Sequence, residues 1–184
     1  MAESMLGLKR TCRCAELSEA NVGQTVTVMG WVAKQRNKGG LVFVDLRDRT
    51  GIVQLAFDDA TKKSVFEKAT ALRSEFVVMA SGKVRVRSSI NKEIPTGEIE
   101  IEVQDLKILG ASETPPFEIL NDSNANEELR LRYRYLDLRR PDIQNNILLR
   151  HKIVKVTRDY FDENGFIEIE TPTLIKSTPE GARD

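Results

Sequence analysis

The stretch LVFVDLRDRTGIVQLAF (residues 41–57) contains two runs of alternating side chains on either side of a short polar turn. A period of two is the pattern of a β-strand with one buried face, because successive side chains of a strand point to opposite sides. Residues 48–51, Asp-Arg-Thr-Gly, have the composition of a tight turn. Residues 41–47 and 51–57 are therefore predicted to pair as an antiparallel hairpin.

Another strand is predicted before this hairpin. From Thr25 onward, Val26, Val28 and Val32 alternate with threonine and tryptophan side chains. Gly30 lies within this run and offers a place for the strand to coil. The run is therefore predicted to be the first strand of the same sheet.

Beyond the hairpin, residues 60–72 carry apolar side chains at helical spacing, and residues 76–87 and 97–109 return to strand patterns. The predicted order is three strands, a helix and two strands. This is the layout of an OB-fold, a five-stranded barrel that often binds oligonucleotides. The predicted fold class is therefore mainly β, with the helix between strands 3 and 4.

The second half of the chain has a different character. Residues 110–126 contain two adjacent prolines and a run of Asn, Asp and Ser, which is typical of a linker. Residues 126–140 are a charged stretch with helical character and five arginines. Pro141 then begins a longer predicted helix that runs to about Glu163 with an apolar stripe.

Asn164 and Gly165 are predicted to end this helix, and residues 166–170 to form a strand that Pro172 stops. The 44 residues from Pro141 to Asp184 are too few to close a core of their own. We expect them to pack on chain that this sequence lacks or on a second copy, so the sequence is predicted to be truncated. The predicted domains are an N-terminal segment (1–24), the barrel (25–109), a linker (110–126), and a hinge helix with the start of another domain (127–184).

Charge and cysteine content limit the classes of function. Lys and Arg total 28 and so do Asp and Glu, so a nucleic-acid site must be a local patch. Cys12 and Cys14 are too close for an easy disulfide, and no Cys or His cluster completes a metal site, so reduced thiols and no metal are expected. No stretch approaches the roughly 20 apolar residues of a membrane span, and no signal peptide is visible. A cytoplasmic protein without a membrane partner is predicted.

The alternation also decides which side chains the barrel displays. If the valines and leucines of residues 41–57 fill the barrel, Phe43 and Gln54 stand on the outer face of neighbouring strands. An outward ring can stack on a base at about 1–3 kcal/mol, and an amide can bond the edge of that base. Alternatively, Phe43 is a single exposed aromatic or is covered by another domain. The pattern alone does not separate these interpretations.

The last predicted strand repeats this logic, with Ile99, Ile101 and Val103 inward and glutamates that include Glu100 outward. A carboxylate can accept hydrogen bonds from the N1–H and N2 groups of guanine, so one of them could read a purine. Outward glutamates are also the ordinary composition of a solvated face. Four basic residues lie where phosphates could meet them, namely Lys34, Arg36, Arg85 and Arg87.

Catalytic motifs are missing from this pattern. The sequence has no glycine-rich phosphate loop, no nucleophile–histidine–acid set and no metal-ligand spacing. Glu168 and Glu170 alternate along a predicted strand and need not converge on one point. The residues by themselves therefore predict a protein that binds, without an evident catalytic site.

Four strings of the sequence are distinctive, namely GWVAKQRNKGGLVFVDLRDRTGIVQ at 30–54, TGEIEIEV at 96–103, RYRYLDLRRP at 132–141 and GFIEIETPTLIKSTPEGARD at 165–184. Together they resemble the bacterial-type aspartyl-tRNA synthetases, a class II family. The first string is shared in looser form by the lysine and asparagine enzymes, whereas RYLDLRRP and TPEGARD are more specific to the aspartate enzyme.

This resemblance implies that the barrel grips the anticodon stem-loop of tRNA-Asp. Phe43 matches the ring that stacks on the central uridine, and Gln54 matches the reader of that base. Glu100 matches the carboxylate that reads the first anticodon base, a guanine or its modified form. The remaining matches, near the anticodon backbone, are Arg36, Arg85 and Arg87.

The resemblance also implies that residues 141–174 are motif 1 of a class II catalytic domain, which forms a homodimer interface that includes Gly165, Phe166 and Pro172. Glu180 matches a mobile loop that closes over the aspartate substrate. The full-length parent would use ATP and Mg to make aspartyl-adenylate and then charge tRNA-Asp. Because motifs 2 and 3 have no counterpart here, the 184-residue chain is expected to bind no cofactor and to be inactive alone.

Three alternatives stay open at this point, and one of them is a barrel that is used only for protein contacts. The parent could be a non-discriminating synthetase that charges both tRNA-Asp and tRNA-Asn. The chain could instead be a stand-alone OB-fold module that binds RNA or single strands, although the motif 1-like tail has no purpose in such a module.

Overall fold

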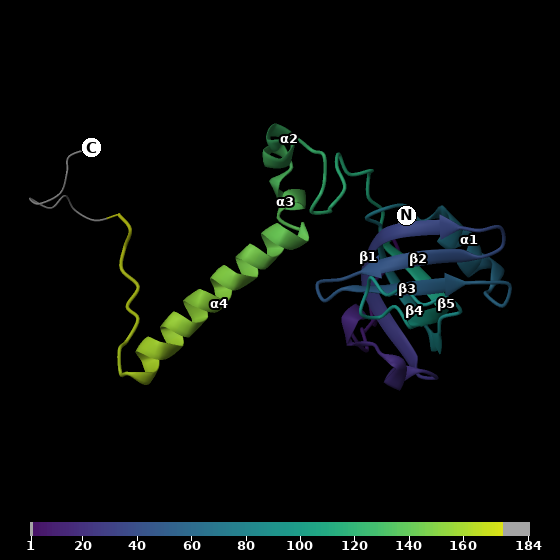
Figure 1. Ribbon diagram of the computed structural model, residues 1–184, viewed down its shortest axis with the longest axis horizontal. Helices are drawn as coiled ribbons and strands as arrows, with labels where there is room; N and C mark the ends of the chain where they lie inside the picture. Colours follow the sequence, from purple (N-terminus) through teal and green to yellow (C-terminus); the bar gives the residue numbers. More distant parts are fainter. Residues whose placement is uncertain (1, 175–184) are drawn as a thin grey trace, which may run out of the picture. The chain divides into compact units, whose positions relative to one another are not determined.

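The barrel predicted from the strand patterns is present in the computed structural model, which describes residues 2–174 (Figure 1). The chain divides into two units, Met1–Pro116 and Phe117–Asp184, and each is described by itself. The elements of the first unit are η1 (Cys14–Glu16), η2 (Glu19–Asn21), β1 (Thr25–Asn37), β2 (Val42–Arg47), β3 (Ile52–Phe57), α1 (Lys63–Ala71), β4 (Val77–Val86) and β5 (Ile99–Gly110).

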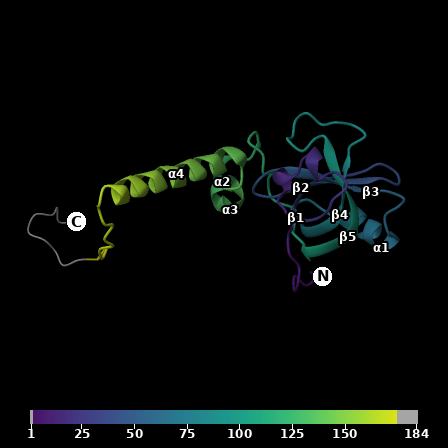
Figure 2. The same cartoon turned by 90° about the horizontal axis from the view of Figure 1, so that it is seen from below.

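The five strands close in the order β1-β2-β3-β5-β4. All neighbours run antiparallel except β3 and β5, which pair in parallel. Figure 2 shows the same barrel from below, with α1 beside it. The mainly β OB-fold, with its helix between the third and fourth strands, is therefore confirmed.

The barrel interior holds the side chains that the alternation assigned to it. Val44, Leu46 and Leu55 are completely buried, and so are the other inward-facing side chains of β2 and β3, namely Val42, Val53 and Phe57. Val65 and Ala69 of α1 pack against the same core. Each such side chain contributes roughly 1.5–3 kcal/mol when it is fully buried. Burial of this one face fixes the register, because a slip of one residue would turn every apolar side chain outward.

Gly30 is required by close approach of two strands. A Cβ built on Gly30 would lie 2.3 Å from the carbonyl oxygen of Arg47 on β2. The sequence indicated a glycine that lets β1 coil. The structure adds the reason that no larger residue fits there.

The turn between β2 and β3 is held by the carboxylate of Asp48. It accepts hydrogen bonds from the backbone N–H of Thr50 at 2.7 Å, from the Thr50 hydroxyl at 2.6 Å and from the backbone N–H of Cys14 at 3.0 Å. Asp48 therefore ties the predicted turn to the N-terminal segment, whose Cys14 lies in the barrel core.

The second unit is helical and contains α2 (Glu127–Arg132), α3 (Arg134–Asp137) and α4 (Pro141–Glu163). The single helical stretch predicted for residues 126–140 is broken, because Tyr133 leaves the helical region with φ −110° and ψ 48°. Leu136 of α3 then packs with Phe117 and Ile119 in a small separate core.

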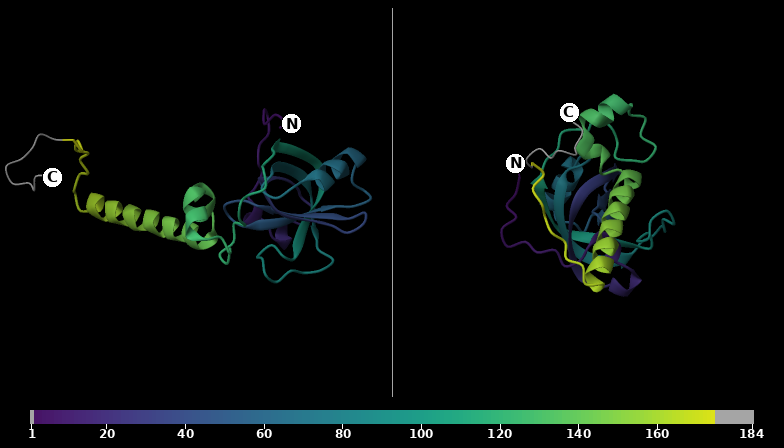
Figure 3. Two further views of the ribbon diagram at one scale, coloured as in Figure 1. Left: turned by 90° about the horizontal axis from the view of Figure 1, so that it is seen from above. Right: turned by 90° about the vertical axis from the view of Figure 1, so that its left-hand side faces the viewer.

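Helix α4 begins and ends where the sequence predicted (Figure 3). Gly165, at φ +82°, takes the left-handed conformation just past its end. The strand predicted for residues 166–170 is wrong, since the structure assigns no strand there. A strand needs a neighbour for its backbone hydrogen bonds, and residues 166–170 have none among the described residues. None of the described helices has the length and apolar character that crossing a bilayer requires.

The Asp48 hydrogen bonds predict a dependence of stability on pH. Burial raises the pKa of Asp48, but the hydrogen bonds from Thr50, Cys14 and Gly51 lower it by more, so the folded-state pKa lies below the ordinary value of 3.8. A lowered pKa stabilises the fold above the unfolded-state value, and this stabilisation is lost as pH falls through the folded-state pKa. Urea unfolding of wild type and Asp48→Asn should therefore show a difference in the free energy of unfolding that shrinks below about pH 4. A difference that stays constant from pH 7 to pH 3 would contradict this assignment.

Candidate nucleic-acid interface

One row of polar side chains crosses four strands on the outer face of the barrel. Asp45 on β2 pairs in register with Gln54 on β3, Gln54 with Glu100 on β5, and Glu100 with Arg85 on β4. Arg36 lies on β1 opposite Phe43 of β2. Because cross-strand partners share a face of the sheet, the register alone brings these side chains together.

The polar groups of this row bond to one another. The Gln54 amide donates from Nε2 to Glu100 Oε2 at 2.7 Å, and its Oε1 accepts from the Arg36 guanidinium at 3.1 Å. Arg36 also donates to Asp45 Oδ1 at 2.7 Å. At the other end, the Nε of Arg85 donates to Glu100 Oε1 at 2.8 Å. We call the connected set of Arg36, Asp45, Gln54, Arg85 and Glu100 the outer-face network.

Gln54 and Glu100 are far less exposed than the sequence suggested. They point away from the barrel interior, as the alternation predicted, but they are only 4% and 5% exposed. The alternation gives the direction of a side chain and carries no information on neighbours that cover it. Here the covering groups come from strands distant in sequence, and the polar atoms are satisfied by these neighbours, as buried polar atoms generally are.

Arg85 is held by more carboxylates than any other residue of the network. Its guanidinium contacts Asp58 at 3.0 Å, Glu100 at 2.8 Å and Glu102 at 3.1 Å. Burial acts to lower the pKa of Arg85, but the hydrogen bonds and charges of Glu100 and Asp58 raise it by more, so the pKa lies above its ordinary value. Arg85 therefore stays charged and engaged within the barrel face.

A pocket of about 400 Å³ opens over the network. Its floor combines the half-buried ring of Phe43 with the polar atoms of Gln54 and Glu100. An aromatic face beside polar groups suits an unstacked base, which needs both a stacking partner and edge contacts. The residues that line this pocket are Arg36, Lys38, Phe43, Gln54, Arg87, Ser88, Ser89, Ile90, Asn91 and Glu100.

One wall of the pocket, residues 88–91, did not emerge from the sequence patterns. It belongs to the β4–β5 loop, the teal connection that projects from the barrel in Figure 3. The loop folds back because the Asn91 N–H donates to the Gly97 carbonyl at 3.0 Å, and a Cβ on Gly97 would meet the Asn91 oxygen at 1.6 Å. The glycine at position 97 was the available signal, but it does not reveal which strand the loop leans over.

Arg87 and Lys38 differ from Arg36 and Arg85 of the network, which are both engaged by carboxylates. Arg87 is partly exposed, Lys38 is exposed, and both border the pocket. Within residues 2–174 neither side chain forms an ion pair. Their charges are therefore available to an anionic ligand at the rim.

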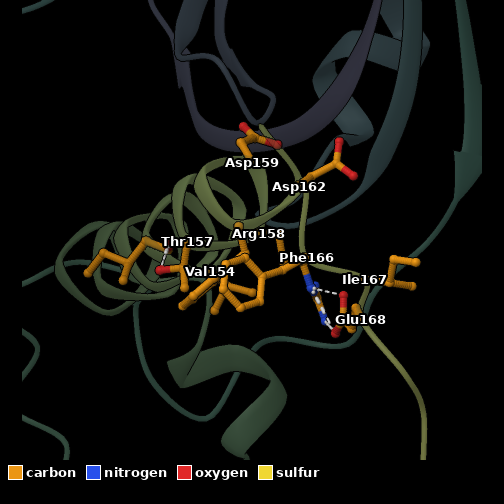
Figure 4. A pocket seen from close by; sticks show the side chains of 10 residues that line it. Val154, Thr157, Arg158, Asp159, Asp162, Phe166, Ile167 and Glu168 are labelled. Atoms are coloured by element: carbon orange, nitrogen blue, oxygen red, sulfur yellow. Dashed lines mark hydrogen bonds and ion pairs between the residues drawn. The ribbon is translucent and has the colours of Figure 1, made fainter. Parts of the chain in front are cut away.

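A larger hollow of about 770 Å³ lies in the second unit, between the C-terminal part of α4 and residues 166–168 (Figure 4). Phe161 and Phe166 meet edge to face there with ring centroids 5.4 Å apart, and Arg158 pairs with Glu168 at 2.9 Å. Gly165, Phe166 and Pro172, predicted for a dimer interface, lie at or just after this end of α4. Glu180 lies outside the described residues.

Comparisons with known protein families match both units. Residues 26–109 match the OB-fold nucleic acid binding domain, and residues 126–184 match tRNA synthetases class II (D, K and N). The aspartate–tRNA ligase of Ruminiclostridium cellulolyticum is 60% identical over the whole chain, and the aspartate–tRNA(Asp/Asn) ligase of Lachnoclostridium phytofermentans is 59% identical. The chain spans 31% of the length of each of these two relatives.

Solved structures agree with the fold. The asparaginyl-tRNA synthetase of Pyrococcus horikoshii complexed with asparaginyl-adenylate superposes with a TM-score of 0.80 at 29% identity, over 95% of this chain and 39% of that one. The aspartyl-tRNA synthetase of Entamoeba histolytica superposes with a TM-score of 0.82 at 22% identity, over 96% of this chain and 42% of that one. The second likeness concerns the fold alone.

Replacing Gln54 should test whether the outer-face network contributes to stability. Gln54→Leu keeps the volume but leaves Arg36 and Glu100 each short of one hydrogen-bond partner, which costs roughly 1–3 kcal/mol. Denaturant unfolding should show this loss. Gln104→Leu is the control, because Gln104 is exposed on β5 and should change stability by less than about 0.5 kcal/mol. Equal effects of the two substitutions would show that the network contributes nothing.

Proposed function

Because the chain belongs to the aspartyl-tRNA synthetase family, we propose that its barrel binds the anticodon loop of tRNA-Asp. The observation that carries this proposal is the pocket in which Phe43, Gln54 and Glu100 meet. It offers a ring for stacking, an amide and a carboxylate for base edges, and a basic rim for phosphates.

Each residue of the pocket then has a distinct role. Phe43 stacks on the central uridine, and Gln54 bonds the edge of that base. Glu100 has lone pairs beyond those used by Gln54 and Arg85, with which it accepts from the first anticodon base, a guanine. Arg87 meets the backbone phosphates at the rim, Arg36 borders the pocket, and Arg85 bonds Glu100 without lining the pocket itself.

For the whole protein we propose the activity of an aspartate–tRNA ligase, with ATP and Mg as cofactors and an aspartyl-adenylate intermediate. The described residues include no group of three or more His, Cys, Asp or Glu that could hold a metal ion, so they do not fit a magnesium site. An aspartate–tRNA ligase and an aspartate–tRNA(Asp/Asn) ligase match the chain at similar identity, 60% and 59%. A non-discriminating ligase is therefore the second candidate, and charging of both tRNAs by the whole protein separates the two.

We further propose that the second unit contributes to a homodimer of the whole protein, which works in the cytoplasm. Helix α4 carries exposed apolar side chains, among them Leu149, Ile153 and Val156, each 58–66% exposed. Apolar side chains gathered on one element in this way favour a contact with another protein surface. Gly165, Phe166 and Pro172 follow this helix and belong to the same proposed interface.

Removing the stacking ring tests the proposed anticodon site. Phe43→Ala should weaken binding of an RNA hairpin with the tRNA-Asp anticodon loop by about 1–3 kcal/mol, that is, about 5- to 150-fold in Kd. Trp31→Ala is the control, since Trp31 is 37% exposed in the middle of β1 and does not line the pocket. Equal affinities of wild type and Phe43→Ala, measured by fluorescence anisotropy, would refute the base-stacking role.

The 184-residue chain by itself should bind tRNA-Asp without charging it. The described residues supply a base pocket, whereas the proposed adenylate chemistry needs charge stabilisation at a phosphate. Aspartate-dependent exchange of pyrophosphate into ATP should stay at background for this chain. Exchange above background by the purified chain, free of host synthetase, would contradict the expectation.

A further inference from the structure

We propose that Asp45 and Arg85 are positioning residues that fix the orientation of the Gln54 amide and thereby its preference for uracil over cytosine. This inference rests on the proposed function of the pocket. In this proposal Arg85 holds Glu100 and does not contact a phosphate.

The argument begins with the two ends of the Gln54 amide. Its oxygen faces the Arg36 guanidinium and its NH₂ group faces the Glu100 carboxylate. A flipped amide would set NH₂ against a cation and oxygen against an anion, so the charged neighbours permit one orientation. The amide keeps one acceptor lone pair and one N–H after these bonds, and both remain for a ligand.

The remaining pair of groups discriminates between pyrimidines. Uracil presents an N3–H donor beside the O4 acceptor, whereas cytosine presents an N3 acceptor beside the N4 donor. A base stacked in one pose on Phe43 therefore meets either a matching or an opposed amide, depending only on the orientation of that amide. If Gln54 could turn over freely, it would bond either base.

Asp45 and Arg85 hold the two groups that set this orientation. Asp45 bonds Arg36 at 2.7 Å, and without it the Arg36 guanidinium is free to leave Gln54. Arg85 bonds Glu100 at 2.8 Å, and Asp58 and Glu102 hold Arg85 in turn. Asp45 thus acts on the Gln54 amide through Arg36, and Arg85 acts on it through Glu100.

The charges also argue against a phosphate at Arg85. The network and its immediate partners combine two guanidinium groups with four carboxylates, those of Asp45, Asp58, Glu100 and Glu102. A phosphate placed against Arg85 would lie beside three of these carboxylates, and like charges at such distances repel. Arg87, which has no ion pair among the described side chains, is the better phosphate partner.

The test uses the 184-residue chain and two RNA hairpins that differ in having uracil or cytosine at the central anticodon position. Dissociation constants are measured at several salt concentrations for wild type, Asp45→Asn and Arg85→Gln. The uracil preference is the Kd of the cytosine hairpin divided by the Kd of the uracil hairpin. Both variants should lower this ratio by about tenfold, which is the discrimination that one bidentate base contact provides. The slope of log Kd against log salt should stay unchanged, because no phosphate contact is lost.

Two controls make the result decisive. Arg87→Gln should weaken both hairpins equally and lower the salt slope by about 0.7, and Asp105→Asn, on an exposed β5 side chain, should change neither quantity. An unchanged uracil preference in Asp45→Asn overturns the inference. The inference also fails if Arg85→Gln weakens both hairpins equally and lowers the salt slope, as expected for Arg87→Gln. If Arg85→Gln fails to fold, as judged by circular dichroism, Asp45→Asn decides alone. Wild type that binds neither hairpin would instead refute the proposed function itself.

Discussion

The whole barrel depends on one constraint: apolar side chains on alternate positions of five strands must meet in a closed interior. Because Val44, Leu55 and Ile101 point inward, the residues next to them on each strand must point outward. The same register that buries the core therefore sets Asp45, Gln54 and Glu100 in one row on the outside. The packed core and the outer row of polar side chains are thus two consequences of a single alignment of strands.

The sequence revealed the barrel well and the second unit less well, for physical reasons. Strand alternation is a local pattern, so the hairpin of residues 41–57 and the faces of its side chains follow from the sequence. The helix breaks at Tyr133, whose ring packs against a cluster that includes Phe117, a residue outside any local window. The strand expected at residues 166–170 depended on a neighbour that local pattern cannot supply.

The candidate site shows the same division. The direction of the Gln54 and Glu100 side chains followed from the strand alternation. Their burial did not, because the groups that cover them are contributed by residues up to 46 positions away. The 88–91 wall of the pocket was invisible for the same reason, since it depends on how the β4–β5 loop folds back. Resemblance to a family pointed to the residue positions without their geometry. The pairing of Arg85 with three carboxylates emerges from the structure alone.

A buried polar network on a binding face has a particular advantage over freely exposed groups. Exposed amides rotate and must be ordered when a ligand arrives, which costs binding free energy. Gln54, already bonded at both ends of its amide, has lost that freedom during folding of the barrel. The associated cost is the desolvation of several charges, because the attraction within ion pairs removed from water adds little net stability. Specificity for one base edge is a gain of a different kind, because a fixed donor and acceptor reject the wrong base by leaving polar groups unpaired. The proposed division between a buried floor that reads bases and an exposed rim that meets phosphates follows from this difference in solvation.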